Sequence, residues 1–167
     1  MRLALIVLAL CAAMLSPVHA QDTPVLDARL RVTGDVPAAL DLDAAALAGM
    51  PRMRWTQTEK DGASRRYEGV DLALILLKAG APIRDGLRAS DAGRYLHAQA
   101  RDGYVAVFAL SEFDSGRFVV VDRMDDAPLF AASGPLQLAA LSDGSRRTRW
   151  VKRLTRLELR RSQPAPD

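Results

Sequence analysis

The chain has 167 residues, with 23 Lys or Arg against 20 Asp or Glu and a single cysteine. One cysteine excludes an internal disulfide and any metal site that needs several thiolates. Hydrophobic residues make up 49% of the chain, so the fold must be stabilised by an apolar core, and the length suits one domain.

Residues 1–20 have the layout of a secretory signal peptide. Arg2 gives a positive start, residues 3–15 form an apolar run, and Val18-His19-Ala20 is typical of a cleavage site. The run is shorter than the roughly 20 residues that cross a bilayer, and no later segment approaches that length. We therefore expect a cleaved leader and a periplasmic or secreted protein that is not an integral membrane protein.

Cys11 offers an alternative, a lipid anchor, but it lies inside the apolar run directly after Leu10, where a small residue is expected. Cleavage after Ala20 would leave a chain without cysteine and with His97 as its single histidine. Such a chain has no thiolate ligand, no cysteine nucleophile and no multi-histidine metal site.

The first part of the remaining chain alternates between extended and helical patterns. Apolar side chains alternate with Arg or Thr over residues 28–33, which predicts a strand with one buried face. A brief extended return follows at 40–42, and Asp43 can cap a short helix that stops at Gly49. Residues 53–58 alternate again and predict another strand.

The clearest helix covers residues 71–80, where apolar side chains recur at helical spacing between an Asp71 cap and Gly80. Two extended segments, 95–100 and 104–109, flank an Asp-Gly pair that is typical of a hairpin. A helical turn is expected at 111–113.

Two continuous apolar runs, 118–121 and 136–141, are typical of strands covered on both faces. The last element starts near Trp150, and its leucines suit a helix passing into a strand. The pattern predicts a strand-dominated α+β fold, with mixed sheets and two or three short helices. We expect one domain over 21–162 and a disordered tail at 163–167.

Five segments in order resemble the molybdopterin-binding oxidoreductase domain, the sulfite-oxidase-like fold. They are "LRVTGDV", "RRYEGVDLALILLKAG", "ARDGYVAVFALSEF", "GPLQLAAL" and "TRWVKRLTRLEL". The resemblance implies a molybdenum atom held by a pterin dithiolene and one cysteine thiolate. That cysteine would lie near Trp55 to Thr58, where Thr56 and Gln57 offer only neutral oxygens, which replace a soft thiolate poorly.

The leader also argues against a bound cofactor. A cofactor-loaded protein is exported folded through a twin-arginine signal, and this leader has the single arginine Arg2. We therefore expect no cofactor, no metal ligand and no catalytic residue. The expected function is a binding or sensory accessory module for a small anion or a periplasmic or membrane protein partner. The alternative is a molybdopterin-dependent oxidoreductase that acts on a small oxo-compound with a non-cysteine metal ligand, so whether the protein is an enzyme stays open.

A strongly basic segment closes the chain and contains only one acid, Glu158. Its basic residues are Arg146, Arg147, Arg149, Lys152, Arg153, Arg156, Arg160 and Arg161. The resemblance implies pterin-phosphate contacts in this region, with Arg149 in place of the usual lysine before Trp150. The first four are therefore candidate anion contacts, and the alternative is a solvated face that pairs with acids elsewhere.

Four further residues are candidates for lining the cleft, namely Thr56, Gln57, His97 and Tyr104. His97 lies in the middle of a predicted strand, where a histidine can be a general base but is more often a hydrogen-bonded residue of the cleft wall. Nucleic acid is not an expected partner, since the protein is predicted to be exported and has no aromatic residues interleaved with the basic ones.

Overall fold

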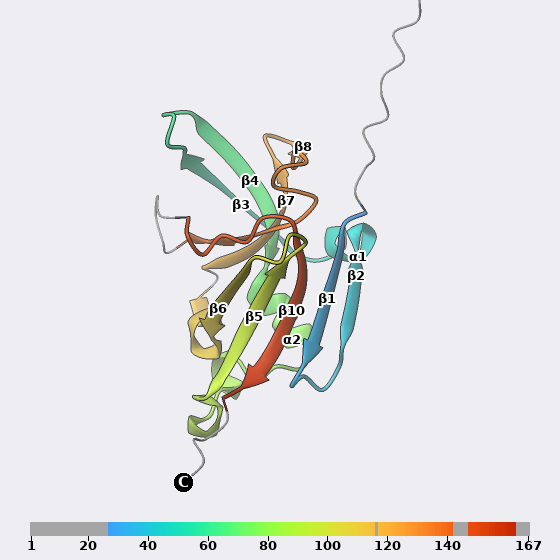
Figure 1. The fold of residues 1–167 in the computed structure, drawn as a ribbon, viewed down its shortest axis with the longest axis vertical. Coiled ribbons are helices and arrows are strands. Elements are labelled where there is room, and N and C mark those ends of the chain that lie inside the picture. The colour runs from blue at the N-terminus through green and yellow to red at the C-terminus, as the bar shows by residue number, and fades with distance from the viewer. Residues whose placement is uncertain (1–26, 116, 142–146, 163–167) are drawn as a thin grey trace, which may run out of the picture.

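The first of two sheets joins strands from both ends of the chain (Figure 1). A computed structural model describes residues 27–115, 117–141 and 147–162. The strands, in the order β2-β1-β10-β5-β6, are Leu40–Asp43, Arg29–Gly34, Leu154–Arg161, Arg94–Ala100 and Val105–Ala109. β1 and β10 are parallel, and the other neighbours are antiparallel.

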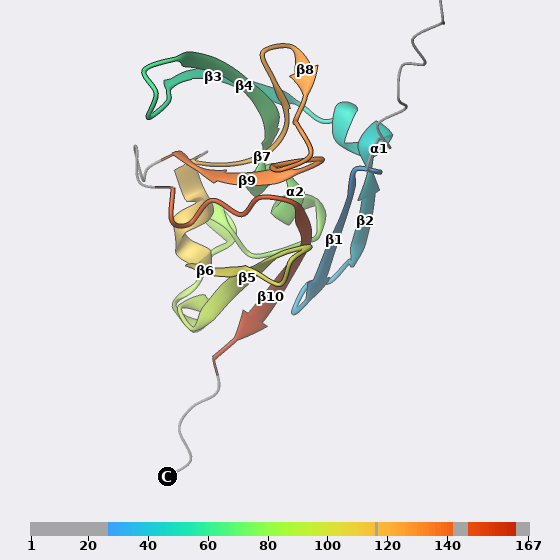
Figure 2. The ribbon, with the colours of Figure 1, turned by 45° about the horizontal axis from the view of Figure 1, so that its top comes forward.

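The second sheet has the order β3-β4-β7-β8, with strands Arg52–Thr58, Ser64–Asp71, Phe118–Met124 and Ala127–Pro128. β9 (Gln137–Ala140) pairs antiparallel with β7, and Leu138 forms a further bridge to Val151. Figure 2 shows this sheet curled over the first one. Residues 147–153, which precede β10, run between the two sheets, so they can contact both.

Two short α-helices are capped as the sequence predicts. α1 (Ala44–Ala48) begins after Asp43, whose carboxylate accepts from the backbone N–H of Ala46. α2 (Leu72–Lys78) begins after Asp71, which accepts from Ala73. Three 3-10 turns, η1 (Arg84–Gly86), η2 (Ala89–Asp91) and η3 (Leu110–Ser115), complete the described helical segments.

The apolar core lies between the sheets. β7 is fully buried from Phe118 to Val121 and β9 along its whole length, as expected of strands covered on both faces. Phe118 packs edge to face on Phe113, with ring centroids 4.8 Å apart, and on Phe108 at 5.2 Å.

The observed architecture confirms the α+β prediction, with strands dominating and two α-helices. The prediction for the last element is wrong, because residues 154–161 form a strand throughout. A register shift between Leu154 and Arg156 places Leu154 and Leu157 on the same buried face, and this spacing of three imitates a helix. The sequence pattern did not predict β4, which lies in the middle of the second sheet.

Among the described residues, no helix combines the length and apolar character that crossing a membrane requires. The predicted leader at 1–20 and the predicted tail at 163–167 lie outside the described residues, as does Arg146.

Candidate functional site

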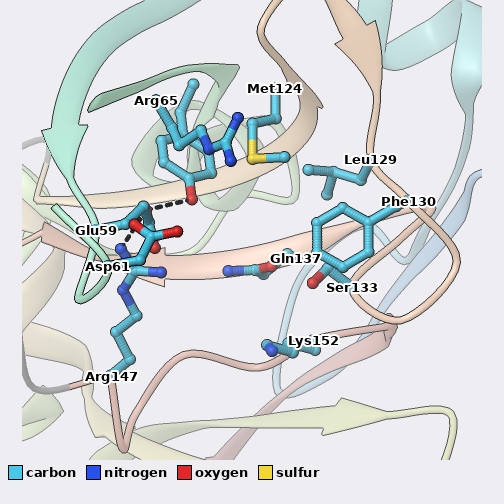
Figure 3. A pocket seen from close by; sticks show the side chains of 11 residues that line it. Glu59, Asp61, Arg65, Met124, Leu129, Phe130, Ser133, Gln137, Arg147 and Lys152 are labelled. Carbon is cyan, nitrogen blue, oxygen red and sulfur yellow. Dashed lines mark hydrogen bonds and ion pairs between the residues drawn. The ribbon is translucent and has the colours of Figure 1, made fainter. Parts of the chain in front are cut away.

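A cavity of about 250 Å³ opens between the second sheet and the segment that leads into β10 (Figure 3). Its lining comes from the β3–β4 turn, β4, the end of β7, the loop after β8, β9 and the segment before β10. The lining residues are Glu59, Asp61, Arg65, Tyr67, Met124, Leu129, Phe130, Ser133, Gln137, Arg147 and Lys152. Segments far apart in the sequence therefore build one polar and one apolar wall.

Three polar groups face the cavity without a partner among the residues that the structure describes. Gln137 and Ser133 are each only 4% exposed, and no hydrogen bond to a described group satisfies either side chain. Lys152 is exposed and forms no ion pair with any residue that the structure describes. Because buried polar groups are normally hydrogen-bonded, a ligand or water in the cavity would supply the partners that these groups need.

Backbone pairing explains why these groups converge. Leu138 and Val151 exchange backbone hydrogen bonds of 2.9 and 3.0 Å, which places Gln137 and Lys152 in neighbouring segments. The backbone N–H of Arg153 donates to the carbonyl of Ser133 at 2.8 Å. The loop after β8 is thereby joined to the segment that carries Lys152.

An acid at the end of the cavity is already neutralised. Arg147 donates to Glu59 at 2.5 Å, and the Tyr67 hydroxyl donates to the same Oε1 atom at 2.7 Å. The Arg147 hydrogen bond is the main reason that the pKa of Glu59 lies below its ordinary value. Burial, helped by the Glu59 contact, raises the pKa of Tyr67 to about 12, so the phenol stays a proton donor.

Aromatic packing holds this acid–base cluster in place. Tyr67 stacks on Trp55 with ring centroids 5.3 Å apart and meets the edge of Trp150 at 6.0 Å. The Arg147 guanidinium lies 4.4 Å above the Trp150 ring, a cation–π contact. Arg147 is therefore held on two sides, by Glu59 and by Trp150.

Two members of the predicted site, Arg147 and Lys152, line this cavity together. They also line a second hollow of about 340 Å³, together with Tyr104. The Tyr104 hydroxyl donates to the carbonyl of Thr148, so it anchors the segment from the first sheet. Tyr104 thus lies beside the cavity of Figure 3 and does not line it.

The other predicted residues lie elsewhere. Thr56 is exposed on β3 and Gln57 is half-buried there, and neither lines the cavity. His97 lies on the outer face of the first sheet, opposite Glu158 and Val107 in the neighbouring strands. Its Nδ1 atom has no hydrogen-bond partner among the described residues.

Arg149 points away from the cavity. It donates to Glu112 at 2.7 Å, and its guanidinium lies 5.3 Å from the centroid of the Phe108 ring. Most of the basic segment is paired in the same way, which is the alternative that the sequence left open. The other ion pairs of this segment are Arg153 with Asp102, Arg156 and Arg160 with Glu158, and Arg161 with Asp35.

Sequence reasoning missed Glu59, Tyr67, Ser133 and Gln137. One of them carried a signal, because Gln137 is a polar residue inside the apolar run of β9. A long amide in a strand buried on both faces needs a partner or a cavity. The other three are brought into the site by tertiary contacts alone.

The residues present do not fit a molybdenum–pterin group of the kind that the resemblance implies. The described residues contain no cysteine, and no group of three His, Cys, Asp or Glu among them could hold a metal ion. Soft metal centres need thiolate ligands, which the amide, hydroxyl and ammonium groups here do not replace. The cavity of about 250 Å³ is also smaller than the roughly 300–1,000 Å³ of pockets for drug-sized ligands.

A solved structure with a similar fold is the sulfane dehydrogenase SoxCD from Paracoccus pantotrophus, with a TM-score of 0.62. The two sequences are 18% identical, and the match covers 78% of this chain but 37% of the other. The likeness therefore concerns the fold. No protein-family model matches the chain, and a search of curated proteins found no match.

Proposed function

We propose that this chain is an exported, cofactor-free accessory module that binds a small anion in the cavity of Figure 3. The observation that carries the proposal is the convergence of Lys152, Gln137 and Ser133 on one cavity without partners among the described residues. Export rests on the leader at residues 1–20, and the relation to molybdopterin-dependent enzymes rests on the resemblance and on the SoxCD-like fold.

The charges around the cavity favour an anion. Arg147 neutralises Glu59, and Arg65 forms an ion pair with Asp125 at 3.2 Å. Lys152 supplies an ammonium that forms no ion pair with a described acid, and the Gln137 and Ser133 side chains supply neutral donors in the same cavity. An anion would satisfy all three donors at once, and hydrogen bonds from a charged donor are the stronger kind.

Replacing Lys152 by glutamine is expected to weaken acetate binding at low ionic strength by about tenfold or more, because a charge-assisted hydrogen bond is lost. Isothermal titration calorimetry with acetate measures the affinity. The remaining affinity should also depend less on salt.

Lys78→Gln is the matched control, since it removes the same charge from the end of α2 and Lys78 lines none of the cavities described above. Equal acetate affinity in wild type and Lys152→Gln would contradict the proposal. So would the absence of any acetate binding to the wild type.

We expect purified protein to contain no stoichiometric molybdenum and no pterin, because the described residues offer no thiolate for the metal. Elemental analysis and pterin fluorescence after denaturation measure both. Molybdenum near one atom per chain would favour the other hypothesis, a molybdopterin-dependent oxidoreductase of small oxo-compounds with a non-cysteine ligand.

A further inference from the structure

The side of the cavity away from Lys152 carries a group of apolar side chains beside Arg65. Figure 3 shows Met124 and Leu129 above the cavity, Phe130 at its side and Lys152 below. Phe130 is 54% exposed, although the other phenylalanines that the structure describes are buried in the core. An exposed aromatic ring beside a polar cavity is a feature that stability alone does not explain.

One turn holds the apolar and polar sides at a fixed separation. The carbonyl of Phe130 accepts from the N–H groups of Ser133 at 2.9 Å and Gly134 at 2.8 Å. The carbonyl of Ser133 then accepts from Arg153, the residue after Lys152. Backbone hydrogen bonds therefore join the segments that carry Phe130, Ser133 and Lys152.

Size and charge restrict what such a cavity can take up. A dry cavity of about 150 Å³ accepts a benzene-sized molecule, so 250 Å³ has room for a ring and a carboxylate. An inorganic oxyanion would leave the apolar wall facing water. Lys152 can pair with one negative charge, because the other lining cations, Arg65 and Arg147, already pair with acids. A second negative charge on the ligand would lie near Glu59 and Asp61.

The geometry points to an organic monoanion with an apolar body as the ligand, a small aromatic carboxylate being the class that fits best. Its carboxylate lies at Lys152, Gln137 and Ser133, and its apolar part lies against Phe130, Leu129 and Met124. This inference rests on the proposed function and specifies the ligand of the same cavity.

The test compares benzoate, acetate, sulfate and benzyl alcohol by calorimetry against the whole protein. Benzoate is expected to bind about tenfold or more tightly than acetate and sulfate, because its ring adds buried apolar area. Benzyl alcohol is expected to bind at least about tenfold more weakly than benzoate, because it lacks the charge. If acetate or sulfate binds as tightly as benzoate, the ligand class is wrong while the anion site stands.

Two variants assign the preference to Phe130. Phe130→Ala should weaken benzoate binding severalfold and acetate binding much less, because acetate has only a methyl group to bury, and Phe130→Leu should keep part of the preference. Val107→Ala is the matched control, since Val107 is 53% exposed on the outer face of the first sheet, away from the cavity. Equal loss for benzoate and acetate in Phe130→Ala, or tight benzyl alcohol binding, would overturn the inference.

Discussion

Replacing Gly69 by alanine is expected to destabilise the fold by about 3 kcal/mol or more, a large part of the roughly 5–15 kcal/mol that holds a typical domain together. A β-carbon at this position would lie 2.2 Å from the carbonyl oxygen of Val120 and 2.8 Å from a methyl group of Val119. Both belong to β7, a central strand that is hydrogen-bonded on both sides, so neither can move without breaking the ladder. Urea denaturation followed by circular dichroism measures the loss.

Gly86→Ala is the control, because no atom lies within 4 Å of the position that its β-carbon would take. Its free energy of unfolding should stay within about 0.5 kcal/mol of the wild type. An unchanged midpoint for Gly69→Ala would mean that β4 and β7 do not approach each other as described.

The strand around Gly69 also shows where sequence reasoning reaches its limit. β1, β7 and β9 were predicted because alternation or continuous apolar runs reflect burial directly. β4 carries Ser, Arg and Glu side chains that suggest a polar loop. Pairing with other strands explains these charges, since Glu68 accepts from Arg52 on β3 at 2.9 Å and Arg52 also binds Asp122 on β7.

The candidate site was also predicted only in part, because local sequence patterns do not show which distant residues pair. The basic run identified Arg147 and Lys152, which share the cavity, but it gave Arg149 the same status. Only the fold shows that Arg149 is paired with Glu112 and lies beside Phe108. Long-range pairing of β9 with the segment before β10 brings Gln137 next to Lys152, and no local pattern encodes that pairing.

Glu59→Gln is expected to have two opposite effects, a loss of stability and a gain in anion affinity. Glu59 accepts hydrogen bonds from both Arg147 and Tyr67, so losing its charge should lower the free energy of unfolding by about 2–3 kcal/mol at neutral pH. The same change leaves the Arg147 guanidinium without its acid at the edge of the cavity. Acetate and benzoate should then bind severalfold more tightly, since one negative charge is lost and one cation is released.

The dependence of stability on pH provides an independent measurement of the same contact. Because the pKa of Glu59 is lowered in the folded state, its contribution is fully present above the ordinary value of 4.5 and is lost as the pH falls through the folded value. The melting temperature should therefore fall less steeply between pH 7 and pH 3 for Glu59→Gln than for wild type.

Asp61→Asn is the charge-matched control for the change in anion affinity, because the Asp61 carboxylate accepts from the backbone of Ala63 and is not paired with Arg147. If Asp61→Asn raises anion affinity as much as Glu59→Gln, the gain comes from the net charge of the cavity and not from the release of Arg147.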